Sequence, residues 1–412
     1  MRSYRELFRT SEFTPLFLAS AGHTTAQTVS GLALGVLVYR QTDSALLSSL
    51  AMFGTAFAQV IGAATVLSGA DRLPPRAAMT VLGLLFGAGT AAQAVPGLPV
   101  WAVFAVLLGL GVVGSVGGGV RYGLLNEILT RDGYLLGRSV LNMSTGVVQI
   151  CGFALGGALV TAISARGTLL LSAALYVLAA AVAGCGLGSR PPRGAGRASI
   201  AETWRTNARL WSSVPRRYVY LALWVPNGLI VGVESLYVPY SPGDAGLLFA
   251  FGAAGMLVGD VVAGRFLPAR WRERLTVPLC VLLAAPYLFF SLRPGVPIAL
   301  VLVTVATFGY AAGLLLQERL MALTPDALSG QALGLHSSGM LTMQGVGAAV
   351  AGSVAELTSP ATGIVVMAAA SLTATLMLAP GLRGGTAAGG EATGSERGAV
   401  TAGERGATAA GE

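Results

Sequence analysis

The sequence predicts an all-α membrane protein with twelve transmembrane helices in two parallel six-helix repeats. Three observations support this fold class: an apolar composition, twelve apolar stretches long enough to cross a bilayer, and short motifs that recur in both halves of the chain. Of the 412 residues, 54% are hydrophobic and only 11% are charged, and the mean hydropathy is +0.71. A soluble domain carries roughly 25% charged residues, so the composition excludes an ordinary soluble protein.

The predicted helices are apolar runs of about 20 residues, the length needed to cross the hydrocarbon core of a bilayer. They must be helical, because an open sheet would leave backbone groups unpaired in lipid. The first run follows arginines and resembles a secretory signal, but it continues to Tyr39, so we expect an uncleaved first span. In chain order the runs are residues 13–38, 45–68, 77–95, 99–120, 139–163, 167–187, 218–239, 245–263, 275–292, 296–317, 330–355 and 360–380.

The arginines predict the orientation of these spans. With the N-terminus inside, 23 of the 26 arginines fall on the inner side, and only Arg40, Arg166 and Arg293 fall outside. Such a positive-inside bias is typical of multi-pass membrane proteins. We therefore expect a multi-pass protein of the cell membrane with both termini in the cytoplasm. The net charge of +8 is spread over these inner loops, so it does not indicate a nucleic-acid partner.

The chain divides into a six-helix N-terminal half (residues 1–188), a loop (189–217), a six-helix C-terminal half (218–382) and a tail (383–412). In the loop, Ser199 and Glu202 form a capping box, and Ile200, Trp204 and Trp211 share one helical face. This pattern predicts an amphipathic helix on the inner membrane surface, with a solvated linker as the alternative. The tail contains mostly Gly, Ala, Thr, Glu and Arg, so we expect it to be disordered.

Short motifs recur in the two halves at nearly constant spacing. The pairs are Arg72 with Arg265, Glu127 with Glu318, and Gln149 with Gln344, at offsets of 193, 191 and 195 residues. Each pair falls at the equivalent span of the two halves. This arrangement predicts parallel repeats related by an axis along the membrane normal.

With these features the sequence resembles the major facilitator superfamily, and most closely its bacterial drug- and natural-product-exporter branches. The resemblance covers about residues 1–382 and includes Tyr4-Arg-Glu-Leu-Phe-Arg9 and the loop Asp71-Arg-Leu-Pro-Pro-Arg76. It implies alternating access, in which the two halves rock about a central cavity. In this family the loop holds the halves together on the inner side, which implies conformational gating by Asp71, Arg72 and Arg76.

Several positions depart from the family patterns. Leu67 and Pro74-Pro75 stand where the loop pattern has Gly and Gly-Arg, and Phe153 stands where the antiporter pattern of the fifth span has Pro. Proton-driven exporters carry an arginine inside the fourth span, whereas Arg121 lies at the inner end of that span. The resemblance therefore predicts the fold and leaves proton antiport open.

Ionisable side chains within the bilayer are costly, so those in the predicted spans are candidates for function. His23 lies about ten residues into the first span, and an imidazole with an ordinary pKa of about 6.5 suits reversible protonation; a neutral ring packed against a neighbouring helix is the alternative. Glu234 lies in the outer half of the seventh span, and a carboxylate that reaches the outer interface is the alternative. Polar amides that could bind substrate, or equally join helices, are Gln27, Gln59, Asn227 and Gln344.

Other charged residues lie near the inner ends of spans and are candidates for conformational gating. They are Asp260, Arg265, Glu127 and Glu318. We expect the glutamates to pair with loop arginines, and Asp260 to have a structural role. Pro226 and Pro286 predict kinks in the seventh and ninth spans.

These features together predict a monomeric secondary transporter that exports a small, largely apolar organic compound, with proton antiport as the coupling that the resemblance suggests. An uptake permease of the same fold is the alternative, and a non-transporting sensor or an intramembrane enzyme is the alternative from another class. Intramembrane enzymes need a catalytic constellation, whereas the two histidines, His23 and His336, are far apart in sequence. The chain has no lysine and no P-loop, and the three cysteines have no metal-site spacing, so we expect neither ATP hydrolysis nor a cofactor or metal.

Overall fold

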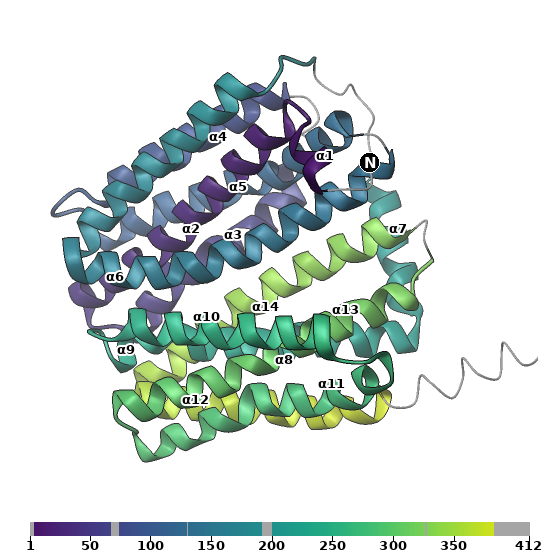
Figure 1. Cartoon of the computed structure of the whole chain (residues 1–412). Helices are drawn as coiled ribbons and strands as arrows, with labels where there is room; N and C mark the ends of the chain where they lie inside the picture. Colours follow the sequence, from purple (N-terminus) through teal and green to yellow (C-terminus); the bar gives the residue numbers. More distant parts are fainter. Residues whose placement is uncertain (1–3, 67–73, 130, 192–199, 326–327, 383–412) are drawn as a thin grey trace, which may run out of the picture.

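The computed structural model describes residues 4–66, 74–129, 131–191, 200–325 and 328–382 (Figure 1). All regular elements in these segments are helices. The helices are α1 (Tyr4–Phe8), α2 (Phe13–Thr42), α3 (Ala45–Val66), α4 (Pro75–Gln93), α5 (Val100–Ile128), α6 (Arg131–Gly186), α7 (Ile200–Ser212), α8 (Val214–Ser235), α9 (Tyr237–Tyr240), α10 (Ala245–Val261), α11 (Ala269–Ala284), α12 (Val296–Phe308), α13 (Ala312–Ala322), α14 (Ser329–Leu357) and a last helix, Pro360–Leu382.

The predicted spans coincide with helices in this part of the chain. Each of the twelve apolar runs overlaps at least one helix, and six helical stretches among the described residues are long and apolar enough to cross a membrane. The prediction of an all-α membrane fold is therefore confirmed. The loop motif around Asp71 and Arg72 and the tail after residue 382 lie outside the described residues.

Two predicted spans, 139–163 and 167–187, fall on α6 and are separated by a break at Ser164. The backbone of Ser164 is not helical, with φ of 72° and ψ of 163°. Its hydroxyl accepts a hydrogen bond from the Gly167 amide at 3.3 Å and so helps to start the second segment. The first segment packs on α2, where Gly152 lies against Thr28, and the second packs on α4, where Ala180 lies against Gly83.

Proline changes the helix geometry in the ninth predicted span. α11 ends at Ala284 and continues as a 3₁₀ helix, Ala285–Leu292, with Pro286 in its first turn. Because proline has no backbone N–H and its ring crowds the preceding turn, an α-helix cannot continue through it undisturbed. The sequence located this irregularity correctly.

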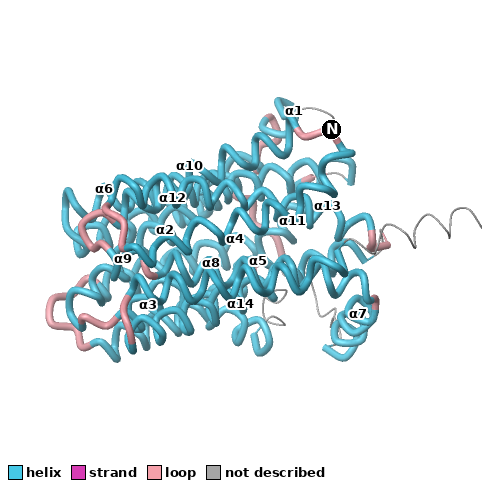
Figure 2. The backbone as a smooth tube through the Cα atoms, turned by 90° about the horizontal axis from the view of Figure 1, so that it is seen from below, coloured by secondary structure: helices cyan, strands magenta, loops and turns pink. Residues whose placement is uncertain are grey.

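The helices form two groups, which lie one above the other in Figure 1. The N-terminal group contains α1 to α6, drawn in purple to teal, and the C-terminal group contains α8 to the last helix, drawn in teal-green to yellow. Helices of both groups run lengthwise between an end that carries α9 and an end that carries α7 (Figure 2). We call these the α9 end and the α7 end.

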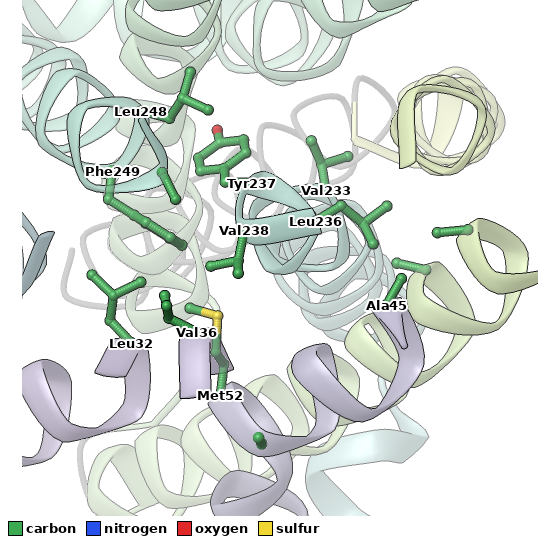
Figure 3. Close-up of a cluster of buried hydrophobic side chains, with 14 of the residues drawn as sticks. Leu32, Val36, Ala45, Met52, Val233, Leu236, Tyr237, Val238, Leu248 and Phe249 are labelled. Carbon is green, nitrogen blue, oxygen red and sulfur yellow. The ribbon is translucent and has the colours of Figure 1, made fainter. Parts of the chain in front are cut away.

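The buried side chains show that the two groups pack tightly at the α9 end. There, one apolar cluster contains Leu32 and Val36 from α2 together with Val233 from α8 and Phe249 from α10 (Figure 3). Two further clusters lie toward the α7 end, and each belongs to one group only: the first contains Phe13 and Leu124, and the second contains Tyr220 and Leu320. The groups therefore share a core at the α9 end and have separate cores at the α7 end.

Candidate functional site

Two adjoining hollows lie between the helix groups. The larger, with a volume of about 290 Å³, is lined mainly by the C-terminal group, and the smaller, of about 200 Å³, mainly by the N-terminal group. We call them the C-terminal hollow and the N-terminal hollow. Four residues line both of them: Phe53, Gln149, Phe153 and Gln344. The two hollows are therefore parts of one central cavity to which both groups contribute.

The N-terminal hollow is polar but uncharged among the described residues. Gln27 from α2 and Gln59 from α3, both candidates from the sequence, lie in its wall. Gln93 from α4 also lies there, and its amide donates a hydrogen bond to the Val103 carbonyl at 3.1 Å. These amides and hydroxyls offer donors and acceptors to a neutral or weakly polar ligand.

The C-terminal hollow carries the ionisable groups of the cavity. Glu234 lies in its wall near the end of α8, and its carboxylate accepts a hydrogen bond from the Tyr310 hydroxyl at 2.9 Å. Asn227 and Gln344 also line it, and the Gln344 amide approaches the Asn227 side-chain oxygen at 3.5 Å. The carboxylate of Glu234 thus faces the cavity and has a hydrogen-bond donor beside it.

Asp260 and His336 lie in the same wall as Glu234, nearer the α7 end. The structure places Asp260 in the lining of the C-terminal hollow, and no ion pair or hydrogen bond joins its carboxylate to another described residue. His336 from α14 is only 6% exposed, and its Nδ1 atom is buried without a hydrogen-bond partner among the described residues. Sequence reasoning singled out His336 only for its distance from His23. His336 and Gln344 are eight residues apart, which puts both on one helix face. This spacing could have identified His336 as a residue of the cavity wall.

The structure separates His23 from the cavity wall. Its ring packs edge-to-face against Phe86 and Tyr176, with both centroid distances at 4.9 Å. His23 lies one helical turn before Gln27, and its ring packs on the Phe86–Tyr176 pair, whose own centroids are 5.3 Å apart, and lines neither hollow. Both His23 and Glu234 are candidates from the sequence, and the structure brings only Glu234 to the cavity wall.

The gating candidates at the α7 end form ion pairs within each helix group. Arg190 binds Glu12 through two hydrogen bonds of 2.5 and 3.0 Å and approaches Glu127 at 3.5 Å. The hydrogen bonds from this guanidinium hold the pKa of Glu12 below its usual value. In the other group, Arg272 donates two hydrogen bonds to Glu318, at 3.0 and 2.9 Å. Sequence reasoning did not single out Glu12, Arg190 or Arg272 as partners, because several arginines are available in each loop.

The remaining gating candidates are exposed. Arg76 lies in the first turn of α4, and Arg265 lies in a short π-helix, Val262–Phe266, that follows α10. Neither makes an ion pair within the described part of the chain. Asp71 and Arg72, the other two gating candidates, lie outside that part.

At the α9 end, direct contacts join the two helix groups. Glu356 of α14 accepts hydrogen bonds from the Ser44 hydroxyl at 3.0 Å and from the Leu46 amide at 3.3 Å, so it caps the start of α3. Phe153 stacks on Phe249 with ring centroids 4.7 Å apart. Gly157 of α6 and Gly246 of α10 touch through their backbones. We call these three contacts the seal; they close the central cavity toward the α9 end.

Solved transporter structures are similar to the chain over most of its length. A POT family transporter in complex with a thioalcohol-conjugated peptide has a TM-score of 0.67 at 12% identity, with 90% of this chain and 96% of that chain covered. The nucleoside transporter NupG has a TM-score of 0.70 at 11% identity, with 90% and 99% covered. A bacterial homologue of the human lysosomal transporter Spinster, in an inward-facing and unoccupied conformation, has a TM-score of 0.64 at 14% identity, with 93% and 96% covered. At such identities the similarity shows the fold.

Sequence comparison identifies the family. No curated protein sequence matches the chain. A family model described as Major Facilitator Superfamily matches residues 16–317, which is more than half of the 412 residues. Together with the helical fold and the transporter structures similar to it, this match identifies a membrane transporter and not an enzyme. The chain belongs to the major facilitator superfamily.

Proposed function

We propose that the chain is a secondary active transporter that exports a small, largely apolar organic compound across the cell membrane by proton antiport. The observation that carries this proposal is the central cavity, which both helix groups line and which lies beside the seal at the α9 end. A binding site between two groups that can pack at either end is the arrangement that alternating access requires. We propose further that the chain acts as a monomer, since each chain contains both walls of the cavity.

The walls of the cavity favour an apolar substrate. The lining of the two hollows includes the apolar side chains of Phe53, Phe153, Phe249, Met256 and Met340. Aromatic and thioether side chains offer large, adaptable contact areas to organic ligands. The peptide and nucleoside named for the similar structures belong to those proteins, and the lining here supports a less polar compound.

Export is tested by expression in a bacterial host that lacks its own efflux pumps. We expect the chain to raise resistance to a subset of lipophilic toxic compounds, and everted membrane vesicles to accumulate those compounds when a pH gradient is imposed. Glu234→Gln, expressed at the same level, is the inactive control. Accumulation by intact cells instead of extrusion would support an uptake permease and contradict export.

We propose that the α7 end faces the cytoplasm, because the arginine distribution puts the loops of that end inside. The seal then lies on the outer side of the membrane. The helix α7 forms between Ile200 and Ser212, and Trp211 stacks on Trp224 of α8 at 5.6 Å. Trp204 is 71% exposed, which supports contact of this helix with the inner membrane surface.

Cysteine labelling tests this orientation at arginines that are exposed in the structure. On a background without Cys151, Cys185 and Cys280, we expect Arg40→Cys and Arg293→Cys to react with a membrane-impermeant thiol reagent in intact cells. Arg209→Cys and Arg270→Cys should react only after the cells are permeabilised. Reaction of either inner position in intact cells would overturn the orientation.

A further inference from the structure

Three tyrosine hydroxyls lie close to the carboxylate of Glu234. Tyr310, from the short 3₁₀ helix Gly309–Ala311 between α12 and α13, donates a hydrogen bond to Glu234 Oε1 at 2.9 Å. The hydroxyls of Tyr237 and Tyr287 lie 2.6 Å apart and are hydrogen-bonded to each other. Both of these residues interact electrostatically with Glu234, and Tyr310 interacts in the same way with the two of them. We call Tyr237, Tyr287 and Tyr310 the tyrosine cluster.

We propose that the tyrosine cluster sets the proton affinity of Glu234, and that Tyr310 is the main positioning residue for this carboxyl group. This inference rests on the proposed proton antiport, with Glu234 as the group that binds the proton. It names the side chains that decide at which pH this proton is bound. A tyrosine hydroxyl suits the role because it is uncharged and both donates and accepts hydrogen bonds. It can therefore bond to the ionised and to the protonated carboxyl group.

Glu234 depends on neutral hydrogen-bond donors in the described part of the chain. An ionised carboxylate in a poorly hydrated site is costly unless a cation or hydrogen-bond donors compensate it. No arginine lies among the described residues that line either hollow. The helices packed on α8 approach it with neutral side chains: Gln344 from α14, Ser49 from α3 and Ser371 from the last helix. The compensation of the carboxylate therefore comes from hydroxyl groups.

Besides the tyrosines, the titratable groups that share the C-terminal hollow with Glu234 are Asp260 of α10, Cys280 of α11 and His336 of α14. Among the described residues, none of these three makes a hydrogen bond or an ion pair with Glu234. Asp260 is 15 residues along α10 from its start at the α9 end, about 22 Å at 1.5 Å per residue, whereas Glu234 is one residue from the end of α8 at that end. Tyr310 is therefore the side chain that bonds to this carboxylate in the described part of the chain.

Packing fixes the Tyr237–Tyr287 pair in place. Tyr237 is 1% exposed and Tyr287 is fully buried, and both belong to the apolar cluster that joins the two helix groups. The ring of Tyr237 packs edge-to-face against Phe249 at 5.0 Å, and the ring of Tyr287 lies 5.8 Å from that of Phe290. Two hydroxyls that share one hydrogen bond use only one of their two protons. Because Tyr237 lines the C-terminal hollow with Glu234 and Tyr287 does not, we assign the second proton to Tyr237, on the side of the carboxylate.

The test measures the protonation of Glu234 and does not depend on transport. Purified full-length protein is titrated with acid and base while its infrared spectrum is recorded. Subtraction of the spectrum of Glu234→Gln isolates the C=O band of the protonated carboxyl group. For each tyrosine variant, the spectrum of the same variant with Glu234→Gln is subtracted. The midpoint is the pH at which this band reaches half of its full height.

Tyr310→Phe keeps the ring and removes the hydrogen bond to the ionised carboxylate, which favours the protonated form. We expect its midpoint to lie above that of the wild type by about one pH unit or more, because a hydrogen bond to a charged group changes an equilibrium roughly tenfold or more. Tyr237→Phe should raise the midpoint by less. Tyr240→Phe is the matched control and should leave the midpoint unchanged, because the Tyr240 hydroxyl donates to the Pro294 carbonyl at 2.8 Å and the residue lines neither hollow. The Tm of each variant verifies that it is folded.

A midpoint in Tyr310→Phe that equals that of Tyr240→Phe or lies below it would overturn the proposal, and so would the absence of a Glu234 band at every pH. An unchanged midpoint in Tyr237→Phe would overturn the role of the Tyr237–Tyr287 pair. These outcomes are distinct from failure of the proposed function. If the midpoint moves as expected but Glu234→Gln still accumulates substrate under a pH gradient, the tyrosine cluster stands and the coupling role of Glu234 falls. If Glu234→Gln loses gradient-driven transport and the midpoint of Tyr310→Phe is unchanged, the coupling role stands and the tyrosine cluster falls.

Discussion

Replacement of Glu234 by glutamine is expected to abolish transport driven by a pH gradient while substrate exchange across the membrane continues. Antiport requires one group that binds a proton when the cavity faces one side and releases it when the cavity faces the other. Glu234 is a carboxylate in the cavity wall with the Tyr310 hydroxyl 2.9 Å away. A glutamine keeps the size and still accepts this hydrogen bond, but it cannot take up or release a proton at any working pH.

The measurement uses the purified protein in liposomes with an imposed pH difference. A pH-sensitive dye inside reports proton movement, and a compound that the efflux screen identifies reports transport. Wild-type protein should accumulate the compound against its gradient, and Glu234→Gln should only equilibrate it. Since His23 packs against Phe86 and Tyr176 and lines neither hollow, His23→Phe is expected to retain coupling. Gradient-driven accumulation by Glu234→Gln would show that another group carries the proton.

The sequence located the helices well because the relevant signals are local. An apolar run of about 20 residues suffices to predict a span, and arginine counts suffice to assign each loop to the inner or the outer side of the membrane. Pro286 likewise predicted an irregularity in the ninth span, where the α-helix changes to a 3₁₀ helix, since the missing backbone N–H acts within one turn. The break at Ser164 was expected only as a loop between two spans, because nothing in its neighbourhood marks the positive φ at that residue.

Side-chain partners were harder to predict because they depend on packing between distant segments. Glu356 is 312 residues from Ser44, and neither residue suggests the other in a sequence where both lie beside apolar runs. His23 looked like a cavity residue from its depth, but depth does not fix which face of α2 meets the cavity. Asp260 looked structural because it precedes Arg265, but no ion pair joins the two in the described part of the chain. In a soluble protein, amphipathic patterning shows which face of a helix points to the core. In a membrane protein this pattern is weak, because lipid and core are both apolar.

Glycine at position 157 makes possible the closest contact of the seal, so Gly157→Val is expected to open it. A Cβ atom added at Gly157 would lie 2.1 Å from the Cα atom of Gly246 and 2.9 Å from its carbonyl carbon. Backbone atoms cannot move aside as a flexible side chain can, so α6 and α10 must separate. Overpacking of a tight contact costs about 1–3 kcal/mol, and each 1.4 kcal/mol changes a conformational equilibrium about tenfold. The sealed conformation should therefore become a minor one.

Two measurements detect this shift toward a conformation open at the α9 end. Transport by Gly157→Val should fall severely, because a cycle needs both conformations, whereas membrane insertion should be normal. A Gln149→Cys reporter in the cavity wall, without the native cysteines, should react faster with an impermeant thiol reagent added outside intact cells. Gly109→Val is the matched control, since a Cβ atom at Gly109 of α5 meets nothing within 4 Å. If Gly157→Val matches Gly109→Val in transport and in the labelling rate of the Gln149→Cys reporter, the contact between α6 and α10 does not hold the cavity closed. The seal then depends on Glu356 and the Phe153–Phe249 stack.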